Sequence, residues 1–266
     1  MKIALFQQVI RDAVRDSIGT TLTTIDITLR VPLSYQSNAL YDARAGEQHW
    51  IIKEYLKSEE FDAAPRREFD ALQLMEPLDI APVPLCHQPP ADAHGPLVIY
   101  EFMEGQMWDR YCPHPSELQE LVILWLTMHN VTQNDLWMSR GHNELLAQKG
   151  LRMIDLLKIY ANWAQAEFPT GREAADLCLS LAQRQQYVLG ELDSYDPPLR
   201  FCRSDPRFAN VIRRPDGRLG MVDWEDSGLR DPARDLADLI THPNQEDLVS
   251  HEQWQAIIKQ YYHVIG

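Results

Sequence analysis

The chain has 266 residues, of which 45% are hydrophobic, so it can bury a sizeable core and wholesale disorder is excluded. Its 25 Lys and Arg residues against 39 Asp and Glu residues give a net charge of −14, which argues against a nucleic-acid partner and is compatible with a cationic one. Its four cysteines do not form a disulfide scaffold, and no apolar run suits a signal peptide or a membrane span, so we expect a cytoplasmic protein with no membrane partner.

The first part of the chain changes from a helical to an extended pattern. Apolar residues at helical spacing over residues 3–18 predict a helix, which Gly19 can end. Between about residues 21 and 55, Thr- and Ile-rich segments separated by a polar turn at residues 44–47 predict antiparallel strands. This region therefore reads as a helix followed by a small antiparallel sheet.

The rest of the chain is mainly helical in pattern. A helix is expected at residues 66–75 and a short buried strand at residues 97–100, after which Glu104-Gly105 resembles a hinge. Apolar residues recur at helical spacing between residues 115 and 192, and again over residues 253–265.

This order predicts an α+β fold with two lobes. A smaller lobe over residues 1–103 would hold the N-terminal helix and the antiparallel sheet. A larger and mostly helical lobe would follow over residues 104–266.

The most informative segment lies in the second lobe. A strand is expected to end at Cys202, and the loop after it carries Asp205 and Asn210. The turn at residues 215–218 then reverses the chain, so Asp223 lies at the end of a hairpin strand beside that loop. Three oxygen-bearing side chains therefore converge.

This convergence suits phosphoryl transfer from ATP, in which catalysis consists mainly of positioning and charge neutralisation. Mg²⁺ prefers carboxylate and amide oxygens, which Asp223 and Asn210 can supply. A third carboxylate, kept off the metal, can orient an acceptor hydroxyl and take its proton. Asp205 fits that catalytic role.

The pattern resembles the catalytic and metal-binding segments of the aminoglycoside phosphotransferase and choline kinase superfamily, distant relatives of protein kinases. Asp205 stands five residues before Asn210, and Asn210 thirteen residues before Asp223, which is the spacing of that superfamily. Trp224-Glu225, Gly228, Asp231-Pro232 and Asp235-Leu236-Ala237 continue the resemblance as D-W-E…G-x-x-D-P-x-x-D-L-A. The resemblance implies a bilobal protein-kinase-like fold with a nucleotide-binding N-terminal lobe.

The resemblance also assigns the nucleotide site, for ATP with GTP as the alternative, together with Mg²⁺. Lys53 looks like the lysine that pairs with the α- and β-phosphates, and Glu68 like the partner that holds it by an ion pair. Ser37 and Asn38 lie where relatives place a phosphate-covering loop, although residues 34–38 contain no glycine. At the hinge, backbone groups around Glu101 and Met103 would hydrogen-bond adenine.

Other matching residues are interpreted as structural, and two features depart from the family. His129 is expected to form hydrogen bonds in the core, while Asp231 and Asp235 are expected to cap or anchor a helix beneath the catalytic loop. Arg203 stands where relatives usually have a His that braces the loop, and we expect an effect on rate. Many relatives also continue beyond this C-terminus, so the acceptor site is expected to be open or completed by another chain.

The acceptor is a small hydroxyl compound in this interpretation, such as an aminoglycoside, choline, ethanolamine or a sugar. A cationic acceptor could meet Glu225, Asp226 or Asp109, and could stack on Trp108 or Trp163. The alternative is a nucleotide-binding pseudokinase that acts as a regulatory or interaction module. A protein kinase is disfavoured because no D-F-G follows at Asp223, and the sequence sets no oligomeric state.

Overall fold

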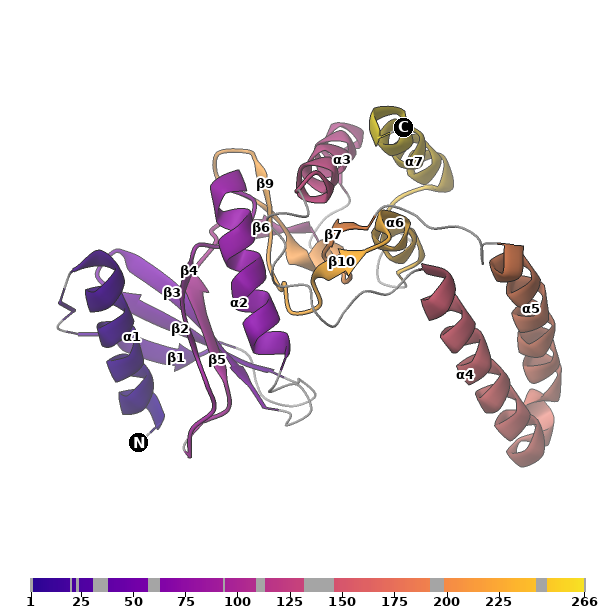
Figure 1. Ribbon diagram of the computed structural model, residues 1–266, viewed down its shortest axis with the longest axis horizontal. Helices are drawn as coiled ribbons and strands as arrows, with labels where there is room; N and C mark the ends of the chain where they lie inside the picture. Colours follow the sequence, from indigo (N-terminus) through magenta and orange to yellow (C-terminus); the bar gives the residue numbers. More distant parts are fainter. Residues whose placement is uncertain are drawn as a thin grey trace.

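The computed structural model describes ten ranges of the chain: residues 2–19, 21–22, 24–30, 38–56, 63–92, 94–108, 113–131, 146–191, 199–242 and 248–265. These ranges form a sheet-rich part that contains the N-terminus and a helical part that contains the C-terminus (Figure 1). In the described ranges, no helix has both the length and the apolar character needed to cross a bilayer.

The N-terminal part is built on one antiparallel sheet with the strand order β1-β2-β3-β5-β4. Its strands are β1 (Asp26–Leu29), β2 (Asn38–Ala45), β3 (Gln48–Tyr55), β4 (Pro84–Gln88) and β5 (Leu97–Glu101). The predicted turn between β2 and β3 is present, and Gly46 has the positive φ of 63° that a tight turn favours. The predicted strands are confirmed, but the edge strand β4 was not expected.

Helices cover both faces of this sheet (Figure 1). Helix α1 (Lys2–Ile18), which ends at Gly19 as predicted, packs Phe6 and Ile10 against Trp50 and Ile52. Helix α2 (Ala64–Met75), followed by the 3₁₀ helix η2 (Glu76–Leu78), belongs to the larger core on the other face. Because side chains alternate along a strand, Lys53 lies on the α2 face.

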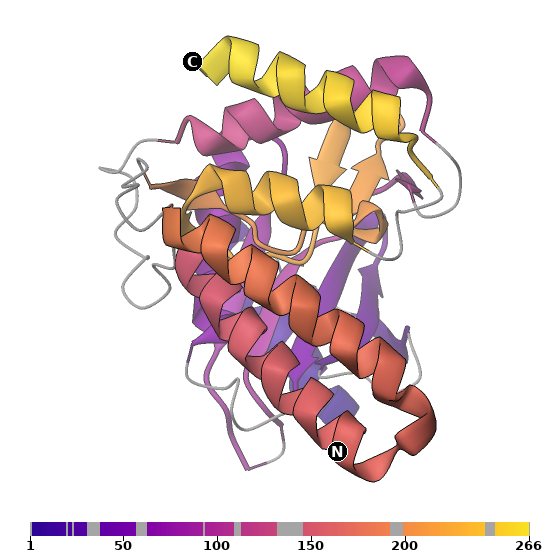
Figure 2. The ribbon, with the colours of Figure 1, turned by 90° about the vertical axis from the view of Figure 1, so that its right-hand side faces the viewer.

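The C-terminal part is mostly helical. Its helices are α3 (Pro115–His129), α4 (Leu146–Glu167), α5 (Arg172–Glu191), α6 (Pro232–Thr241) and α7 (His251–Ile265), with a 3₁₀ turn η5 (Pro169–Gly171) between α4 and α5. Figure 2 shows α7 beside α3, with α6 below them and the α4–α5 hairpin in front. The predicted helical character of this part is confirmed.

Two small sheets lie between these helices and the large sheet. One pairs β7 (Arg200–Cys202) with β10 (Gly228–Arg230), and the other has the order β6-β8-β9. The strands of the second small sheet are β6 (Gln106–Met107), β8 (Val211–Arg213) and β9 (Leu219–Met221). The 3₁₀ helix η6 (Phe208–Asn210) directly precedes β8, so these short strands fix both ends of the segment that carries Asp205 and Asn210.

Gly105 connects the two parts of the chain at the predicted hinge. Its φ of +143° is one that residues with a side chain rarely adopt, and a Cβ added there would overlap with the backbone oxygen of Arg213. Only glycine therefore lets the chain pass this closely to β8 on its way into β6.

Candidate active site

Asp205 lies in the loop between β7 and η6, and its side chain contacts Asn210. The Asn210 amide nitrogen lies 3.2 Å from Oδ2 of Asp205, so the two residues form one hydrogen-bonded unit. Ser204, just before Asp205, has a positive φ of 69°, which is uncommon for a residue other than glycine. Such a conformation persists only where surrounding contacts hold it.

Those contacts come from α6, through the fully buried carboxylate of Asp235. It accepts hydrogen bonds from the backbone N–H groups of Arg203, at 2.8 Å, and Ser204, at 2.9 Å. His129, from α3, also contacts it, with Nε2 3.3 Å from Oδ2 of Asp235. Asp231 caps α6 by accepting from Ala233 N–H at 3.0 Å. The predicted anchoring role of these residues is confirmed.

Arg203 joins the Asp205 loop to the segment that carries Asp223. Its fully buried guanidinium donates to the backbone carbonyl of Asp205, to that of Val222 at 2.6 Å and to that of Asp223 at 2.9 Å. A planar guanidinium can reach several carbonyls at once, which a histidine ring at this position could not do. Arg203 therefore braces both segments through the backbone.

Lys53 is the centre of a buried ion cluster on the face of the sheet that meets the C-terminal part. Its Nζ lies 3.0 Å from Glu68, 2.6 Å from Asp223 and 2.8 Å from Glu225. Burial alone would lower the pKa of Lys53, but Asp223 and Glu68 outweigh it and raise this pKa well above its ordinary value. The lysine is therefore permanently charged.

Glu68 is held in this cluster by further hydrogen bonds. Its Oε2 accepts from the Tyr55 hydroxyl at 2.5 Å, and its Oε1 accepts from the Trp224 backbone N–H at 3.3 Å. Burial raises the pKa of Glu68, although the charge of Lys53 opposes that shift. The structure thus brings Glu68 to Lys53, as the resemblance predicts, and links both to the segment after Asp223.

Asp223 and Asn210 present oxygen atoms that suit a hard cation. Burial would raise the pKa of Asp223, but Lys53 and Arg203 lower this pKa to about 2. Its Oδ1 bonds to Lys53, and its Oδ2, which lies 3.7 Å from Nη2 of Arg207, can still accept a metal ion. The Asn210 amide nitrogen donates to Asp205, which leaves the amide oxygen as a ligand. A carboxylate and an amide oxygen are ligands that Mg²⁺ accepts, so the donor set fits the predicted ion.

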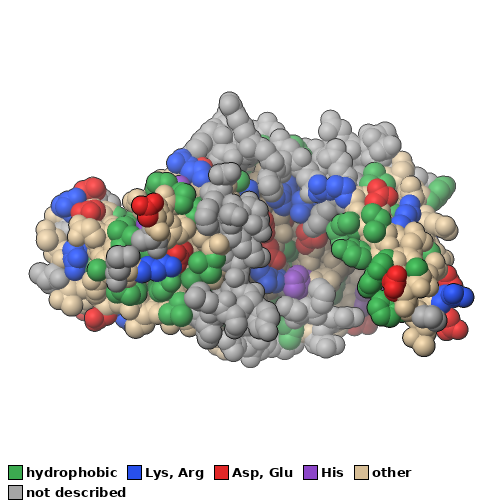
Figure 3. Space-filling model, turned by 90° about the horizontal axis from the view of Figure 1, so that it is seen from below, with side chains coloured by type: hydrophobic (Ala, Val, Ile, Leu, Met, Phe, Trp, Pro, Cys, Tyr) green, Lys and Arg blue, Asp and Glu red, His purple; other side chains and the backbone are tan. Residues whose placement is uncertain are grey.

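One cavity of about 350 Å³ brings four of the predicted residues together. Its lining includes Asn38, Lys53, Asn210 and Asp223. Seen from below, the molecule is hollowed between its two parts, and acidic and basic side chains lie in the hollow (Figure 3). Ser37, the other residue predicted for the phosphate-covering loop, lies outside the described residues.

Two residues of this site were missed from the sequence. Glu225, which the sequence placed in the D-W-E pattern and among the carboxylates for a cationic acceptor, bonds to Lys53 and accepts from Asn38 at 2.8 Å. Arg207 was not singled out, yet its Nε and Nη2 lie 2.8 Å and 2.5 Å from Oδ2 of Asp205. The two-residue spacing from Asp205 was the available signal for Arg207.

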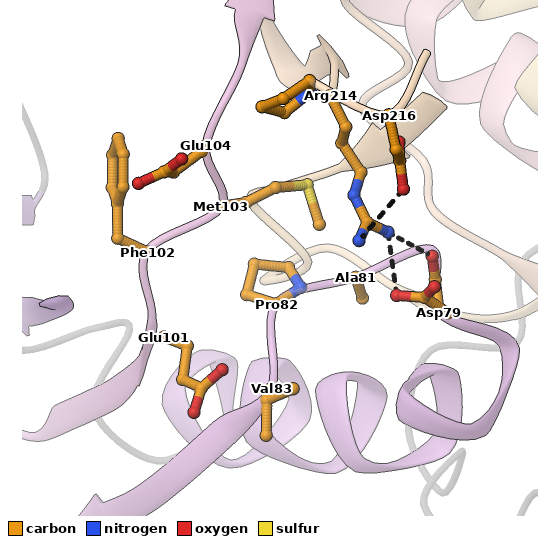
Figure 4. A pocket seen from close by; sticks show the side chains of 11 residues that line it. Asp79, Ala81, Pro82, Val83, Glu101, Phe102, Met103, Glu104, Arg214 and Asp216 are labelled. Carbon is orange, nitrogen blue, oxygen red and sulfur yellow. Dashed lines mark hydrogen bonds and ion pairs between the residues drawn. The ribbon is translucent and has the colours of Figure 1, made fainter. Parts of the chain in front are cut away.

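The hinge residues Glu101 and Met103 do not line this cavity. They line a second cavity of about 320 Å³, together with Pro82 and Arg214, in which Met103 points toward Arg214 (Figure 4). Glu101 N–H donates to Val83 at 2.8 Å, whereas Met103 N–H donates to no described residue. With no acceptor among the described residues, the Met103 N–H can make the adenine contact that the resemblance implies, which stays a prediction.

The residues considered for binding a cationic acceptor differ in how exposed they are in the structure. Trp108 is fully buried and packs edge-on against Phe208 at 5.3 Å, so the hypothesis that it stacks on an acceptor is wrong. Trp163 on α4 is 55% exposed and Asp226 is also exposed, whereas Asp109 lies outside the described residues. Asp226 and Trp163 therefore remain as candidates.

The chain is similar in sequence to one protein family and in fold to several solved structures. A sequence profile of the phosphotransferase enzyme family matches residues 28–264. A spectinomycin phosphotransferase solved with ADP and spectinomycin is similar at 12% identity and a TM-score of 0.62, covering 96% of this chain and 79% of that one. A choline kinase from Cryptosporidium parvum Iowa II is similar at 17% identity and a TM-score of 0.65, covering 96% and 78%.

An ethanolamine kinase from Plasmodium vivax is also similar, at 16% identity and a TM-score of 0.59, covering 90% of this chain and 68% of that one. No curated protein sequence matches this chain significantly. At such low identities the solved structures show the fold, which is the predicted bilobal, protein-kinase-like α+β fold.

Proposed function

The chain belongs to the phosphotransferase enzyme family, and we propose that it is an ATP-dependent kinase that phosphorylates a hydroxyl group of a small molecule. The observation that carries this proposal is the convergence of Lys53, Asn210 and Asp223 on one cavity, with Asp205 hydrogen-bonded to Asn210. This set contains a buried cation for phosphates, two oxygen ligands for a metal and a separate carboxylate for a base.

In the proposed reaction, Asp205 accepts a hydrogen bond from the acceptor hydroxyl and orients its oxygen toward the γ-phosphorus of ATP. The new bond joins that oxygen to the γ-phosphorus, and the bond between the γ-phosphorus and the bridging oxygen breaks. The electron pair stays on the β-phosphate of ADP, and the proton of the hydroxyl passes to Asp205. The products are a phosphate monoester and ADP.

The rest of the site neutralises and aligns the phosphates. Lys53 would pair with the α- and β-phosphates, and Glu68, with its 3.0 Å contact, would keep the lysine in place. Asn210 and Asp223 would hold Mg²⁺, which supplies positive charge to the phosphate oxygens. Asp235 and Arg203 keep the loop and the Asp223 segment in register through backbone hydrogen bonds. GTP is the alternative phosphate donor.

For the acceptor, we propose a small hydroxyl compound with a cationic group. The net charge of −14 and the exposed carboxylate of Asp226, next to Glu225 in the chain, support this choice. Similar solved proteins include a choline kinase, an ethanolamine kinase and a spectinomycin phosphotransferase, and we infer the same broad class of acceptor here.

Thermal melting with ATP or GTP, with and without Mg²⁺, tests the nucleotide site. A ligand that binds only the folded protein at a hundredfold excess over its Kd stabilises it by about 2.7 kcal/mol, so even modest affinity is visible. We expect a Mg²⁺-dependent rise in Tm that Asp223→Ala abolishes and that Asp12→Ala, whose side chain is 42% exposed on α1, retains. If neither nucleotide shifts the Tm of the wild-type protein, the proposed function is wrong.

A further inference from the structure

Arg207 places a positive charge between the proposed base and the proposed metal ligand. Its Nη2 lies 2.5 Å from Oδ2 of Asp205 and 3.7 Å from Oδ2 of Asp223. The side chain is 39% exposed and lines the same cavity as Lys53 and Asn210. Arg207 therefore stands at the solvent side of the site, whereas Lys53, whose side chain is 4% exposed, stands at its inner side.

One edge of the Arg207 guanidinium, Nε and Nη2, binds Asp205, whereas Nη1 binds no described residue. Nε and Nη2 both donate to Oδ2 of Asp205, at 2.8 Å and 2.5 Å. Nη1 donates to no residue within the described ranges, and Oδ1 of Asp205 accepts from none of them. Because a guanidinium is rigid and planar, Nη1 is held in a fixed direction once the other edge is bound.

The negative charges around the site indicate why a second cation beside Asp205 would favour phosphate binding. Lys53 already faces three carboxylates, those of Glu68, Asp223 and Glu225, so its charge is shared. A γ-phosphate within reach of an acceptor hydroxyl bound to Asp205 would lie close to that negatively charged carboxylate. A cation beside Asp205 offsets this repulsion, and in the described part of the chain Arg207 is the one with a side chain hydrogen-bonded to the Asp205 carboxylate.

We propose that Arg207 binds an oxygen of the γ-phosphoryl group through Nη1 while Nε and Nη2 keep Asp205 oriented. This inference rests on the proposed function and adds a catalytic residue to it. As the bond to the bridging oxygen breaks and the acceptor oxygen bonds to phosphorus, Arg207 stabilises the charge that spreads over the phosphoryl oxygens. The proton still passes from the acceptor to Oδ1 of Asp205.

A narrower role would be to hold the loop by the ion pair with Asp205 alone. The two roles differ in what they do to nucleotide binding. A γ-phosphate contact favours ATP over ADP, because ADP lacks the group that Arg207 binds. A loop-holding ion pair would alter the affinities for both nucleotides equally or leave both unchanged.

Calorimetric titration with a non-hydrolysable ATP analogue and with ADP, both with Mg²⁺, separates these roles. A hydrogen bond to a charged group contributes about 1.5–3 kcal/mol, so we expect Arg207→Gln to weaken binding of the analogue by at least about tenfold. The affinity for ADP should change by less than about threefold. Arg207→Lys, which keeps the charge but not the rigid fork, should lie between Arg207→Gln and the wild-type protein.

The control is Arg15→Gln, since Arg15 on α1 is 57% exposed and pairs with Asp12 and Asp16, which line neither of the two cavities described above. It should bind both nucleotides like the wild-type protein. Melting without nucleotide checks that each variant is folded. Equal losses for the analogue and ADP in both Arg207 variants, or no loss in either, would overturn the γ-phosphate contact. If the wild-type protein bound neither nucleotide, both the proposed function and this inference would be wrong.

Discussion

Replacing Asp235 with alanine tests how the catalytic loop is held. The carboxylate is fully buried and accepts from the backbone N–H groups of Arg203 and Ser204 at 2.8 Å and 2.9 Å. It also contacts His129 at 3.3 Å. Asp235→Ala would leave both backbone donors and the imidazole buried without this acceptor.

The magnitude follows from these three contacts. Hydrogen bonds to a charged group contribute about 1.5–3 kcal/mol each, but they share one carboxylate and are not additive. Removing one partner of a buried charged network costs about 3–5 kcal/mol, and we expect Asp235→Ala to lower the free energy of unfolding by that amount. Because Ser204 has a φ of 69° and depends on these contacts, turnover should fall as well.

Urea unfolding followed by tryptophan fluorescence measures this change. Asp12→Ala is the control because its carboxylate, on α1, is 42% exposed and lies 3.0 Å from Arg15, which is 57% exposed. An ion pair at the surface contributes about 0–1 kcal/mol, so the control should lose at most that much. If Asp235→Ala lost no more stability than Asp12→Ala, the anchoring of the loop by Asp235 would be refuted.

Two further predictions concern the hinge and the response to acid. Gly105→Ala should destabilise the protein by about 2 kcal/mol or more, because residue 105 has a positive φ and the added Cβ would overlap with Arg213. Gly190→Ala, on α5 with open space around the added Cβ, should instead stabilise the protein by about 0.5–1 kcal/mol. Urea unfolding of both variants checks these opposite signs. Burial would raise the pKa of Asp235, but hydrogen bonds from His129 and the loop outweigh burial and lower this pKa. The contribution of Asp235 to the free energy of unfolding is therefore present above the ordinary carboxyl pKa and is lost as the pH falls through the lowered pKa. The stability difference between wild type and Asp235→Asn should therefore shrink from about pH 7 to about pH 3, and a constant difference would contradict this reasoning.

The catalytic segment could be predicted from the sequence because local chemistry specifies it. Strand, loop and turn signals around residues 199–223 placed Asp205, Asn210 and Asp223 beside one another, and the structure places them so. The family resemblance added Lys53 and Glu68, whose side chains meet at 3.0 Å. Their roles in binding nucleotide and metal stay predictions until they are measured.

Long-range contacts and irregular strands could not be predicted in the same way. Glu225 reaches Lys53 from 172 positions later in the chain, and nothing local in its sequence marks that contact. Strand β4 was missed because Pro82 and Pro84 read as breaks, although proline is tolerated on an edge strand, which β4 is. Trp108 looked available for stacking, but its burial against Phe208 depends on tertiary packing.

Transfer of radiolabelled γ-phosphate from ATP to a pool of amino alcohols, sugars and aminoglycosides tests the central claim most directly. The account predicts that the wild-type protein labels an acceptor. It also predicts that Asp205→Asn lowers the rate by at least about 10²-fold while still binding ATP with Mg²⁺. Wild-type turnover that Asp205→Asn leaves unchanged would contradict the assignment of the base. Binding of ATP with Mg²⁺ without transfer to any acceptor would instead point to a nucleotide-binding regulatory module.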